Sequence, residues 1–258
     1  MEDVRKVLNE KYLDGYVYHM THFENLRDIL KSSALLSQQE LDKKGIRSRS
    51  IANQEVQNLR RRIYVWSIPE KRYRPLHSYV PFYFTPYTPM FRNQRDIGIH
   101  NDIIIFEVSR AFIGSIDQSV IFTDGNASNQ QLSKSAGEKV QIVPGTASSN
   151  ICRRRYFPDD QPLGTNTNRS DFYADTALLD HVNWDVINGR FFVEDKEEYK
   201  RLKHAEVLVP DRFPLDEMLT ICVSTEIMVA RVKKVFAELG LTEQSFDLPV
   251  VHKPNLFV

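Results

Sequence analysis

The fold is most constrained by Tyr16-Val17-Tyr18-His19-Met20, which is followed directly by Thr21-His22-Phe23-Glu24. The first run is rich in aromatic and β-branched residues and predicts a short β-strand. In the second run, Thr21 can cap the start of a helix and Glu24 can complete a capping box. A strand that leads directly into a capped helix places His19 and Thr21 at a strand end, where side chains commonly line clefts.

Similar patterns predict the remaining elements. The helix after Thr21 carries Leu26, Ile29 and Leu30 on one face, the spacing of a buried stripe. Further helices are expected at 2–13, 51–62, 175–188 and 224–239. Strands are expected at 79–84, 102–108, 119–123, 205–209 and 219–223. Strands dominate the second half with helices between them, so the predicted class is α+β.

Residues 128–170 differ in composition from the rest of the chain. Ser, Asn, Gly, Thr and Pro dominate there, and the basic and aromatic run Cys152-Arg153-Arg154-Arg155-Tyr156-Phe157 interrupts them. Long loops inside compact domains are uncommon and are often functional. We therefore expect a single domain over residues 1–258, with a long irregular insertion at 128–170.

Composition excludes several classes of protein. The chain has 34 Lys and Arg against 34 Asp and Glu, so its formal net charge is zero. A protein that coats a DNA duplex usually carries a basic excess, so nucleic-acid contacts must come from local patches. Two cysteines exclude a disulfide framework and a multi-cysteine zinc site. No signal-peptide run or stretch of membrane-spanning length is present, which favours a soluble, cytoplasmic protein.

One acidic residue stands inside an apolar strand. Strand alternation puts Glu206 on one face with His204 and Leu208. A carboxylate in such a strand is costly to bury unless it is paired or faces a cleft. Glu206 is therefore either on a solvated face or a catalytic carboxylate in a substrate pocket.

Other candidate sites are ambiguous when each is taken alone. His19 and His22 indicate a metal only weakly, because no cluster of further ligands accompanies them. The aromatic run 79–84 suits core packing, and it also suits a planar ligand such as nicotinamide. Arg60-Arg61-Arg62 has the composition of a solvated charge run. No Gly-rich phosphate motif of the GxGxxG or P-loop type is present.

Together these blocks have a recognisable order. In sequence they are Tyr18-His19-Met20-Thr21-His22, then Ser50-Ile51-Ala52 with Gln57 and Arg60, then His77-Ser78-Tyr79-Val80-Pro81-Phe82-Tyr83-Phe84 with Pro89-Met90, then Phe122-Thr123-Asp124, and finally Ala205-Glu206-Val207-Leu208-Val209. This order resembles the DarT family over roughly residues 16–223. The resemblance implies a PARP-like ADP-ribosyltransferase fold, with a central, mostly antiparallel split sheet flanked by helices.

The resemblance also implies an activity and its partners. DarT proteins are toxins that transfer ADP-ribose from NAD to a base of single-stranded DNA and release nicotinamide. A DarG antitoxin counters them, and its macrodomain removes the modification. For this chain we therefore expect NAD as co-substrate, no metal, single-stranded DNA and a DarG-type antitoxin as partners, and no membrane.

Site residues are carried over position by position. The resemblance implies that Glu206 is the catalytic glutamate and that Arg60 assists the chemistry at the base. The residues expected to bind NAD are His19, Thr21, Asn25, Gln57, Tyr79, Phe82 and Phe84. The residues expected to contact nucleic acid are Arg61, Arg62, His77, Arg153, Arg154, Arg155 and Tyr156.

The chain departs from the thymidine-modifying members of the family after Thr123-Asp124. It carries Gly125-Asn126-Ala127-Ser128-Asn129 where those members have a basic stretch with histidine. Thymidine is slightly favoured over guanosine as the acceptor. The alternatives are an ADP-ribosyltransferase that acts on RNA or protein, a catalytically silent NAD- or nucleic-acid-binding module, and a hydrolase that only consumes NAD.

Overall fold

The fold is built around one large sheet, seen in a computed structural model that describes residues 12–115, 119–129, 139–143, 153–157, 170–189 and 194–258. Within these residues the sheet has eight strands in the order β10-β7-β11-β5-β1-β6-β13-β14. Their bounds in that order are Phe172–Tyr173, Ile121–Asn126, Ala205–Pro210, Tyr79–Tyr83, Tyr16–His22, Ile103–Ser109, Thr220–Val223 and Val250–His252. Neighbouring strands are antiparallel, except for β13 and β14, which are parallel. The predicted α+β class and mostly antiparallel sheet are confirmed.

The sheet divides between β1 and β5. β1 pairs with β6 along its whole length, from Tyr16↔Ser109 to His22↔Ile103. On its other side, the described pairing with β5 consists of Tyr18↔Tyr83. Beyond that pair the two strands diverge, and this is the split expected from the resemblance.

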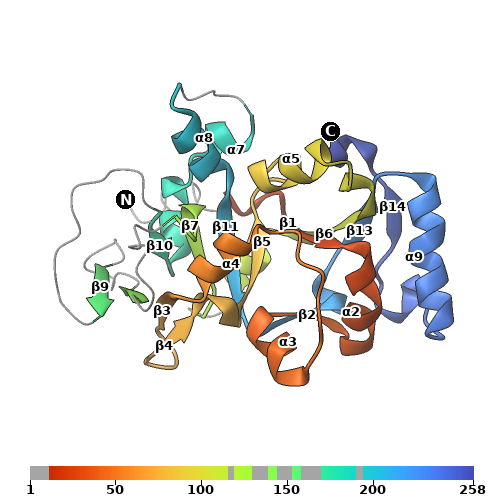
Figure 1. Cartoon of the computed structure of the whole chain (residues 1–258), viewed down its shortest axis with the longest axis horizontal. Helices are drawn as coiled ribbons and strands as arrows, with labels where there is room; N and C mark the ends of the chain where they lie inside the picture. The colour runs from red at the N-terminus through yellow and green to blue at the C-terminus, as the bar shows by residue number, and fades with distance from the viewer. Residues whose placement is uncertain (1–11, 116–118, 130–138, 144–152, 158–169, 190–193) are drawn as a thin grey trace.

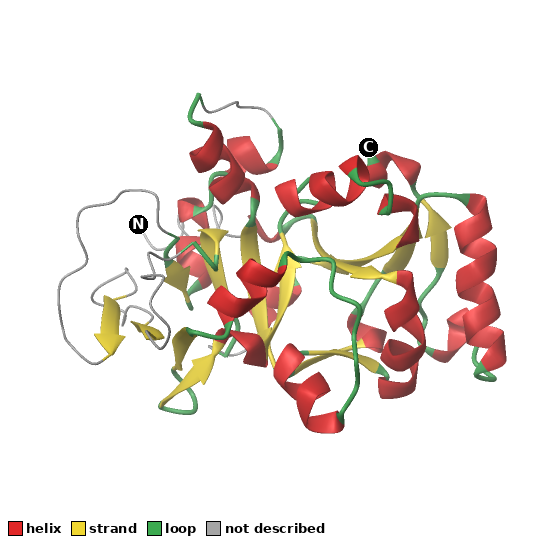
Figure 2. Ribbon diagram, viewed as in Figure 1, coloured by secondary structure: helices red, strands yellow, loops and turns green. Residues whose placement is uncertain are grey.

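Helices surround the sheet and connect its strands (Figures 1 and 2). The α-helices are α2 (Leu26–Ser32), α3 (Gln38–Lys44), α4 (Gln54–Arg60), α5 (Pro89–Asp96), α6 (Phe112–Ser115), α7 (Trp184–Ile187), α8 (Lys196–Lys203) and α9 (Glu226–Glu238). Short 3-10 helices span Phe23–Asn25, Leu76–Ser78, His100–Asp102, Thr176–His181, Leu215–Glu217, Glu243–Ser245 and Pro254–Phe257. α9 packs beside α2 and β14 at one end of the molecule, whereas α8 packs against β7 and α7 at the top of the view in Figure 1.

Two smaller sheets complete the described fold. β12 (Arg212–Pro214) pairs with β2 (Ala34–Leu36). A second small sheet has the order β4 (Arg72–Pro75), β3 (Ile63–Ser67), β8 (Lys139–Val143) and β9 (Arg153–Phe157). β8 and β9 lie inside the segment 128–170, so the prediction of an irregular insertion is wrong for these strands. β-branched residues alternate along β8, and its backbone pairs in parallel with β3.

The start of the first helix also differs from the prediction. β1 runs on to His22, whose imidazole accepts the Glu24 N–H at 3.2 Å and caps a 3-10 turn. Thr21 stays within the strand, and its hydroxyl instead accepts the Asn25 side-chain amide at 2.9 Å. The predicted capping box at Thr21 and Glu24 is therefore wrong. The helix expected at 2–13 lies almost entirely outside the described residues.

The main hydrophobic core lies on one face of the sheet. β5 shows how the strands divide their side chains, because Val80 and Phe82 are fully buried in this core. Phe82 packs edge to face against Phe213 at a centroid distance of 4.9 Å. Alternation turns Tyr79, Pro81 and Tyr83 to the opposite face.

We expect Phe82→Ala to lower the free energy of unfolding by about 3–5 kcal/mol, because it leaves a cavity in a fully buried aromatic cluster. Ile227→Ala is the matched control, since Ile227 is 75% exposed and its truncation should change stability by less than about 0.5 kcal/mol. Urea unfolding followed by circular dichroism measures both. A loss of less than about 1 kcal/mol for Phe82→Ala would contradict this packing.

Candidate active site

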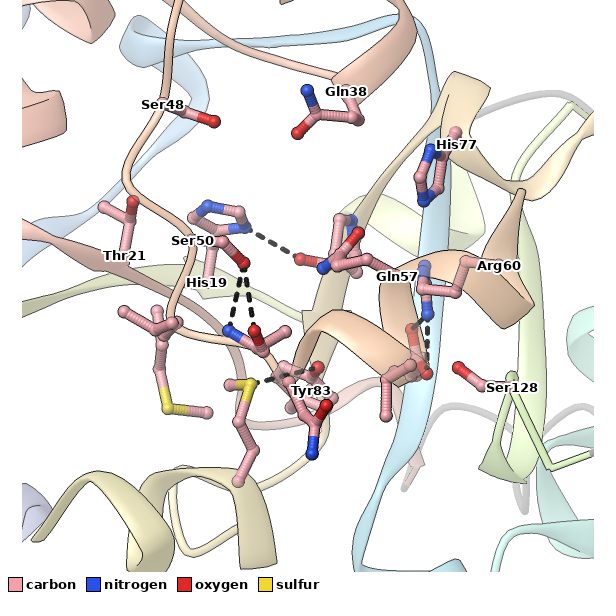
Figure 3. A pocket seen from close by; sticks show the side chains of 18 of the residues that line it. His19, Thr21, Gln38, Ser48, Ser50, Gln57, Arg60, His77, Tyr83 and Ser128 are labelled. Carbon is pink, nitrogen blue, oxygen red and sulfur yellow. Dashed lines mark hydrogen bonds and ion pairs between the residues drawn. The ribbon is translucent and has the colours of Figure 1, made fainter. Parts of the chain in front are cut away.

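A cavity of about 1020 Å³ lies where β1 and β5 diverge. Its walls come from the end of β1, the connection 46–53, α4, β5, β11 and the start of α5 (Figure 3). Ligand pockets in proteins span roughly 300–1,000 Å³, so this cavity is large enough for a dinucleotide. The lining residues on which the chemistry depends are His19, Thr21, Gln57, Arg60, His77, Tyr79, Tyr83, Ser128 and Glu206.

An ion pair is buried at one side of the cavity. Arg60 Nη1 lies 2.9 Å from Glu206 Oε2 and 3.2 Å from Oε1. Arg60 is 7% exposed and Glu206 is 1% exposed. The catalytic and assisting residues expected from the sequence are therefore in direct contact, although 146 positions separate them in the chain.

Backbone groups complete the surroundings of the Glu206 carboxylate. The Ala127 N–H donates to Glu206 Oε1 at 3.1 Å, and the Glu206 N–H donates to the Thr123 hydroxyl at 3.0 Å. A buried carboxylate is stable only when it is paired and hydrogen-bonded, and these contacts meet that requirement. Among the described residues Oε2 accepts from Arg60, and a carboxylate oxygen has room for a second donor such as a substrate hydroxyl.

His19 projects from β1 at the split. Its Nδ1 lies 2.8 Å from the Pro81 carbonyl oxygen on β5, so Nδ1 donates a hydrogen bond. Burial lowers the pKa of His19 to about 4, so the imidazole is neutral near pH 7. Nε2 then carries a lone pair and can accept a hydrogen bond from a ligand hydroxyl.

The structure brings Tyr79 to the cavity, but it does not bring Phe82 or Phe84 there. Both phenylalanines pack in the main core, because alternation along β5 turns them to the opposite face. Tyr83 lines the cavity instead, directly across from Glu206 in the sheet. Burial raises the pKa of Tyr83, and the Glu206 carboxylate adds to this effect, so the phenol stays protonated. The period of two along this strand was the signal that identifies Tyr83.

The connection 46–53 closes one wall, and Asn25 holds it in place. The Asn25 side-chain amide donates to the Arg49 carbonyl oxygen at 3.0 Å, and its oxygen accepts the Arg49 N–H at 2.8 Å. Gln94 on α5 fastens the other end by donating to the Ile51 carbonyl oxygen at 2.8 Å. Asn25 lines the cavity as predicted, but both ends of its amide are engaged by the protein. Its contact with NAD stays a prediction.

The residues expected to contact nucleic acid have different positions. His77 lines the cavity and is 8% exposed, and burial lowers its pKa to about 4. Arg61 is exposed at the end of α4, next to Arg60, and Arg62 is half-buried. The backbone of β9 contains Arg153, Arg154, Arg155 and Tyr156, but their side chains lie outside the described residues.

Sequence reasoning missed Ser128 and His204 as cavity residues. Ser128 follows directly after the Ala127 amide that contacts Glu206, and it lines the cavity beside the ion pair (Figure 3). His204 Nδ1 donates to the Lys200 carbonyl oxygen at 2.9 Å, and Nε2 accepts the Met90 N–H at 3.2 Å. His204 therefore joins α8 to the start of α5.

In the described part of the chain, no three His, Cys, Asp or Glu side chains come together in a group that could hold a metal ion. Cys222 is buried with a free thiol. None of the helices in the described ranges combines the length and the apolar character needed to cross a membrane.

The family of the chain follows from its match to known proteins. Residues 18–170 and 150–258 match the family model described as ssDNA thymidine ADP-ribosyltransferase, DarT. The chain belongs to the DarT family. Membership confirms the resemblance seen in the sequence and makes the chain an NAD-dependent DNA ADP-ribosyltransferase.

Individual DarT relatives are distant. A DNA ADP-ribosyl transferase of Thermus aquaticus is 24% identical over 227 residues, which are 86% of this chain and 81% of the relative. One of Thermus sp. is 40% identical over 74 residues, which are 29% of this chain and 32% of the relative. The solved structure of Thermus sp. 2.9 DarT in complex with ADP-ribosylated ssDNA has a TM-score of 0.66 at 21% identity, covering 95% of this chain and 96% of that one. This likeness confirms the fold.

We expect the imidazoles of His19 and His77 to titrate near pH 4, because burial disfavours their charged forms. Nitrogen-detected NMR of the histidine side chains measures this, and the urea-denatured protein, whose histidines titrate near pH 6.5, is the control. The unfolded chain binds more protons than the folded one between pH 4 and 6.5, so stability should fall as the pH drops through this window. A midpoint near 6.5 in the folded protein would contradict the burial of these rings.

Proposed function

We propose that this cavity transfers ADP-ribose from NAD to a base of single-stranded DNA, with thymine as the acceptor, and releases nicotinamide. The observation that carries the proposal is the buried Arg60–Glu206 pair in the cavity that His19 also lines. A solved structure of Thermus sp. 2.9 DarT in complex with NAD+ shares the fold, with a TM-score of 0.58 at 20% identity over 95% of this chain and 98% of that one.

The first step breaks the bond between nicotinamide and ribose. Positive charge develops on the ribose, and the carboxylate of Glu206, which is almost fully buried, stabilises it electrostatically. Oε2 also accepts a hydrogen bond from a ribose hydroxyl. His19 Nε2, an acceptor in the neutral ring, holds another hydroxyl of the same ribose.

The leaving nicotinamide needs a flat, apolar wall. Tyr79 and Tyr83 face the cavity and serve this purpose in place of Phe82 and Phe84, which lie in the core. Thr21 and Gln57 line the same cavity and supply polar contacts to NAD. Nicotinamide leaves as a neutral ring and takes the bonding electron pair with it.

The acceptor base then attacks the exposed anomeric carbon. A ring nitrogen of thymine is a poor nucleophile until it loses its proton. The Glu206 carboxylate accepts this proton, and Arg60 stabilises the negative charge that develops on the base. Arg61, Arg62, His77 and the run Arg153-Arg154-Arg155-Tyr156 supply phosphate contacts and a stacking surface for a single strand. The presence of both charged groups of the Arg60–Glu206 pair argues against a catalytically silent module.

The proposal extends to the biological role. A solved structure of Thermosipho africanus DarTG in complex with ADP-ribose shares the fold, with a TM-score of 0.57 at 18% identity over 94% of this chain and 51% of that one. This likeness supports a DarG-type antitoxin as the partner that counters the protein, and a toxin that acts on DNA would work in the cytoplasm. The antitoxin's macrodomain would remove the ADP-ribose from DNA.

We expect Glu206→Gln to lower the rate of label transfer from NAD to single-stranded DNA by roughly 10²–10³-fold, because it removes the negative charge that faces the ribose. The assay uses labelled NAD with four oligonucleotides, each lacking one base, beside RNA and duplex controls. Transfer should disappear only when thymine is missing. If transfer disappears instead when guanine is missing, guanine is the acceptor. Label on RNA or protein alone would overturn DNA as the substrate.

Replacing Arg153, Arg154 and Arg155 together by Gln should weaken DNA labelling by about ten-fold or more, because phosphate contacts dominate the affinity for a single strand. The matched control removes three cations from α9 (Arg231, Lys233 and Lys234→Gln), away from the cavity. Turnover of NAD without DNA reports whether the NAD site survives. Equal loss of both activities in the β9 variant would count against a DNA-binding role for this run.

A further inference from the structure

β7 carries a bulge directly opposite Glu206. Ala205 pairs with Asn126, and Val207 pairs with Phe122, so the register shifts around Glu206. Thr123, Asp124 and Gly125 therefore lie against a single residue of β11. Bulges of this kind redirect side chains beside active sites.

The bulge supplies polar groups to Glu206 at two points. The Thr123 hydroxyl accepts the Glu206 backbone N–H and donates to the Gly125 carbonyl oxygen at 2.5 Å. The turn that leaves the bulge presents the Ala127 N–H to the Glu206 carboxylate. The position of the carboxylate in the cavity therefore depends on the position of the bulge.

Arg201 anchors the bulge from α8. Its Nη1 lies 3.2 Å from Asp124 Oδ2 and 3.3 Å from the Ser170 hydroxyl. Its Nε and Nη2 both donate to the Glu198 carboxylate at 2.8 Å. Every nitrogen of the guanidinium thus has a protein partner, and Arg201 is 7% exposed. These contacts leave it suited to holding the protein together rather than to binding a substrate.

Gly125 shows how tightly the bulge sits on α8. A Cβ atom built on Gly125 would lie 2.9 Å from the Arg201 carbonyl oxygen and 2.5 Å from its Nη1. The contact with the carbonyl oxygen is with backbone, which cannot swing aside. Any side chain at this position must push β7 and α8 apart.

We propose that Arg201 is a positioning residue for Glu206, acting through the salt bridge to Asp124 that holds the β7 bulge and its Ala127 N–H against the carboxylate. The inference rests on the proposed function only for its effect on the transfer rate. The anchoring itself is a property of the folded chain and can be measured without substrate.

The first test is hydrogen exchange of the Ala127 amide, followed by NMR. We expect protection in the wild type and at least a ten-fold faster exchange in Asp124→Asn and Gly125→Ala. Glu198→Gln is the matched control, because it also removes one carboxylate partner of Arg201 but leaves the bridge to Asp124. Equal exchange in Asp124→Asn and Glu198→Gln would overturn the anchoring role, and so would unchanged exchange in Gly125→Ala.

The second test is the rate of ADP-ribose transfer at saturating NAD and DNA. Gly125→Ala should lower kcat on the order of a hundred-fold, since small displacements of catalytic groups cost this much. Asp124→Asn should lower kcat by about ten-fold, less than Gly125→Ala, because the asparagine amide oxygen can still accept a hydrogen bond from Arg201. The KM for NAD should stay within about two-fold, and NAD titration gives the folded fraction of each variant.

The possible results distinguish the positioning role of Arg201 from the proposed transfer of ADP-ribose to DNA. Faster Ala127 exchange together with lower kcat supports the positioning role. Faster exchange with kcat equal to the wild type would overturn it. A wild type that transfers nothing to DNA while the Ala127 amide still responds as expected would overturn the proposed function and leave the anchoring of the bulge in place. A fall in kcat that the folded fraction fully accounts for would reduce Arg201 to a stabilising role.

Discussion

The rest of the structure depends on one buried charge pair, Arg60 with Glu206. Neither charge is stable in the interior alone, because an unpaired buried ion costs several kcal/mol. α4 and β11 must therefore lie side by side in the folded chain, with Arg60 at the end of the helix and Glu206 on the strand. The ion pair fixes the part of the cavity wall that α4 and β11 form. The bulge of β7 then places the Ala127 N–H against the Glu206 carboxylate. In the proposed reaction the same contact serves stability and catalysis, which would explain why a carboxylate is kept inside an apolar strand.

Much of the sheet was predictable from the sequence, because its strands have strong local signatures. The central strands β1, β5, β6 and β11 are short, apolar and rich in β-branched or aromatic residues. Glu206 stood out for the same reason, as a charge within such a run. His19 was also placed correctly in the cavity, although it lies in the middle of β1 rather than at the strand end that its sequence predicted.

What could not be predicted depends on contacts between distant parts of the chain. Periodicity showed that β5 has two faces, but only the packed structure shows that Phe82 faces the core while Tyr83 faces the cavity. Thr21 had the composition of a helix cap, yet pairing with β6 keeps it in the strand. The partners of Arg201 come from three separate segments, so no local pattern reveals them. β8 was missed because its surroundings have the composition of a loop.

The divergence of β1 from β5 also affects whether the sheet can pair with a strand of another chain. Where two strands of a sheet diverge, their facing backbone N–H and C=O groups no longer pair with each other. Such groups on an outer strand would invite a second chain to add its own strand. Here the gap lies inside the sheet, between two strands that are each paired on their far sides with β6 and β11. The cavity therefore opens inside the sheet and creates no new edge strand that could pair with another chain.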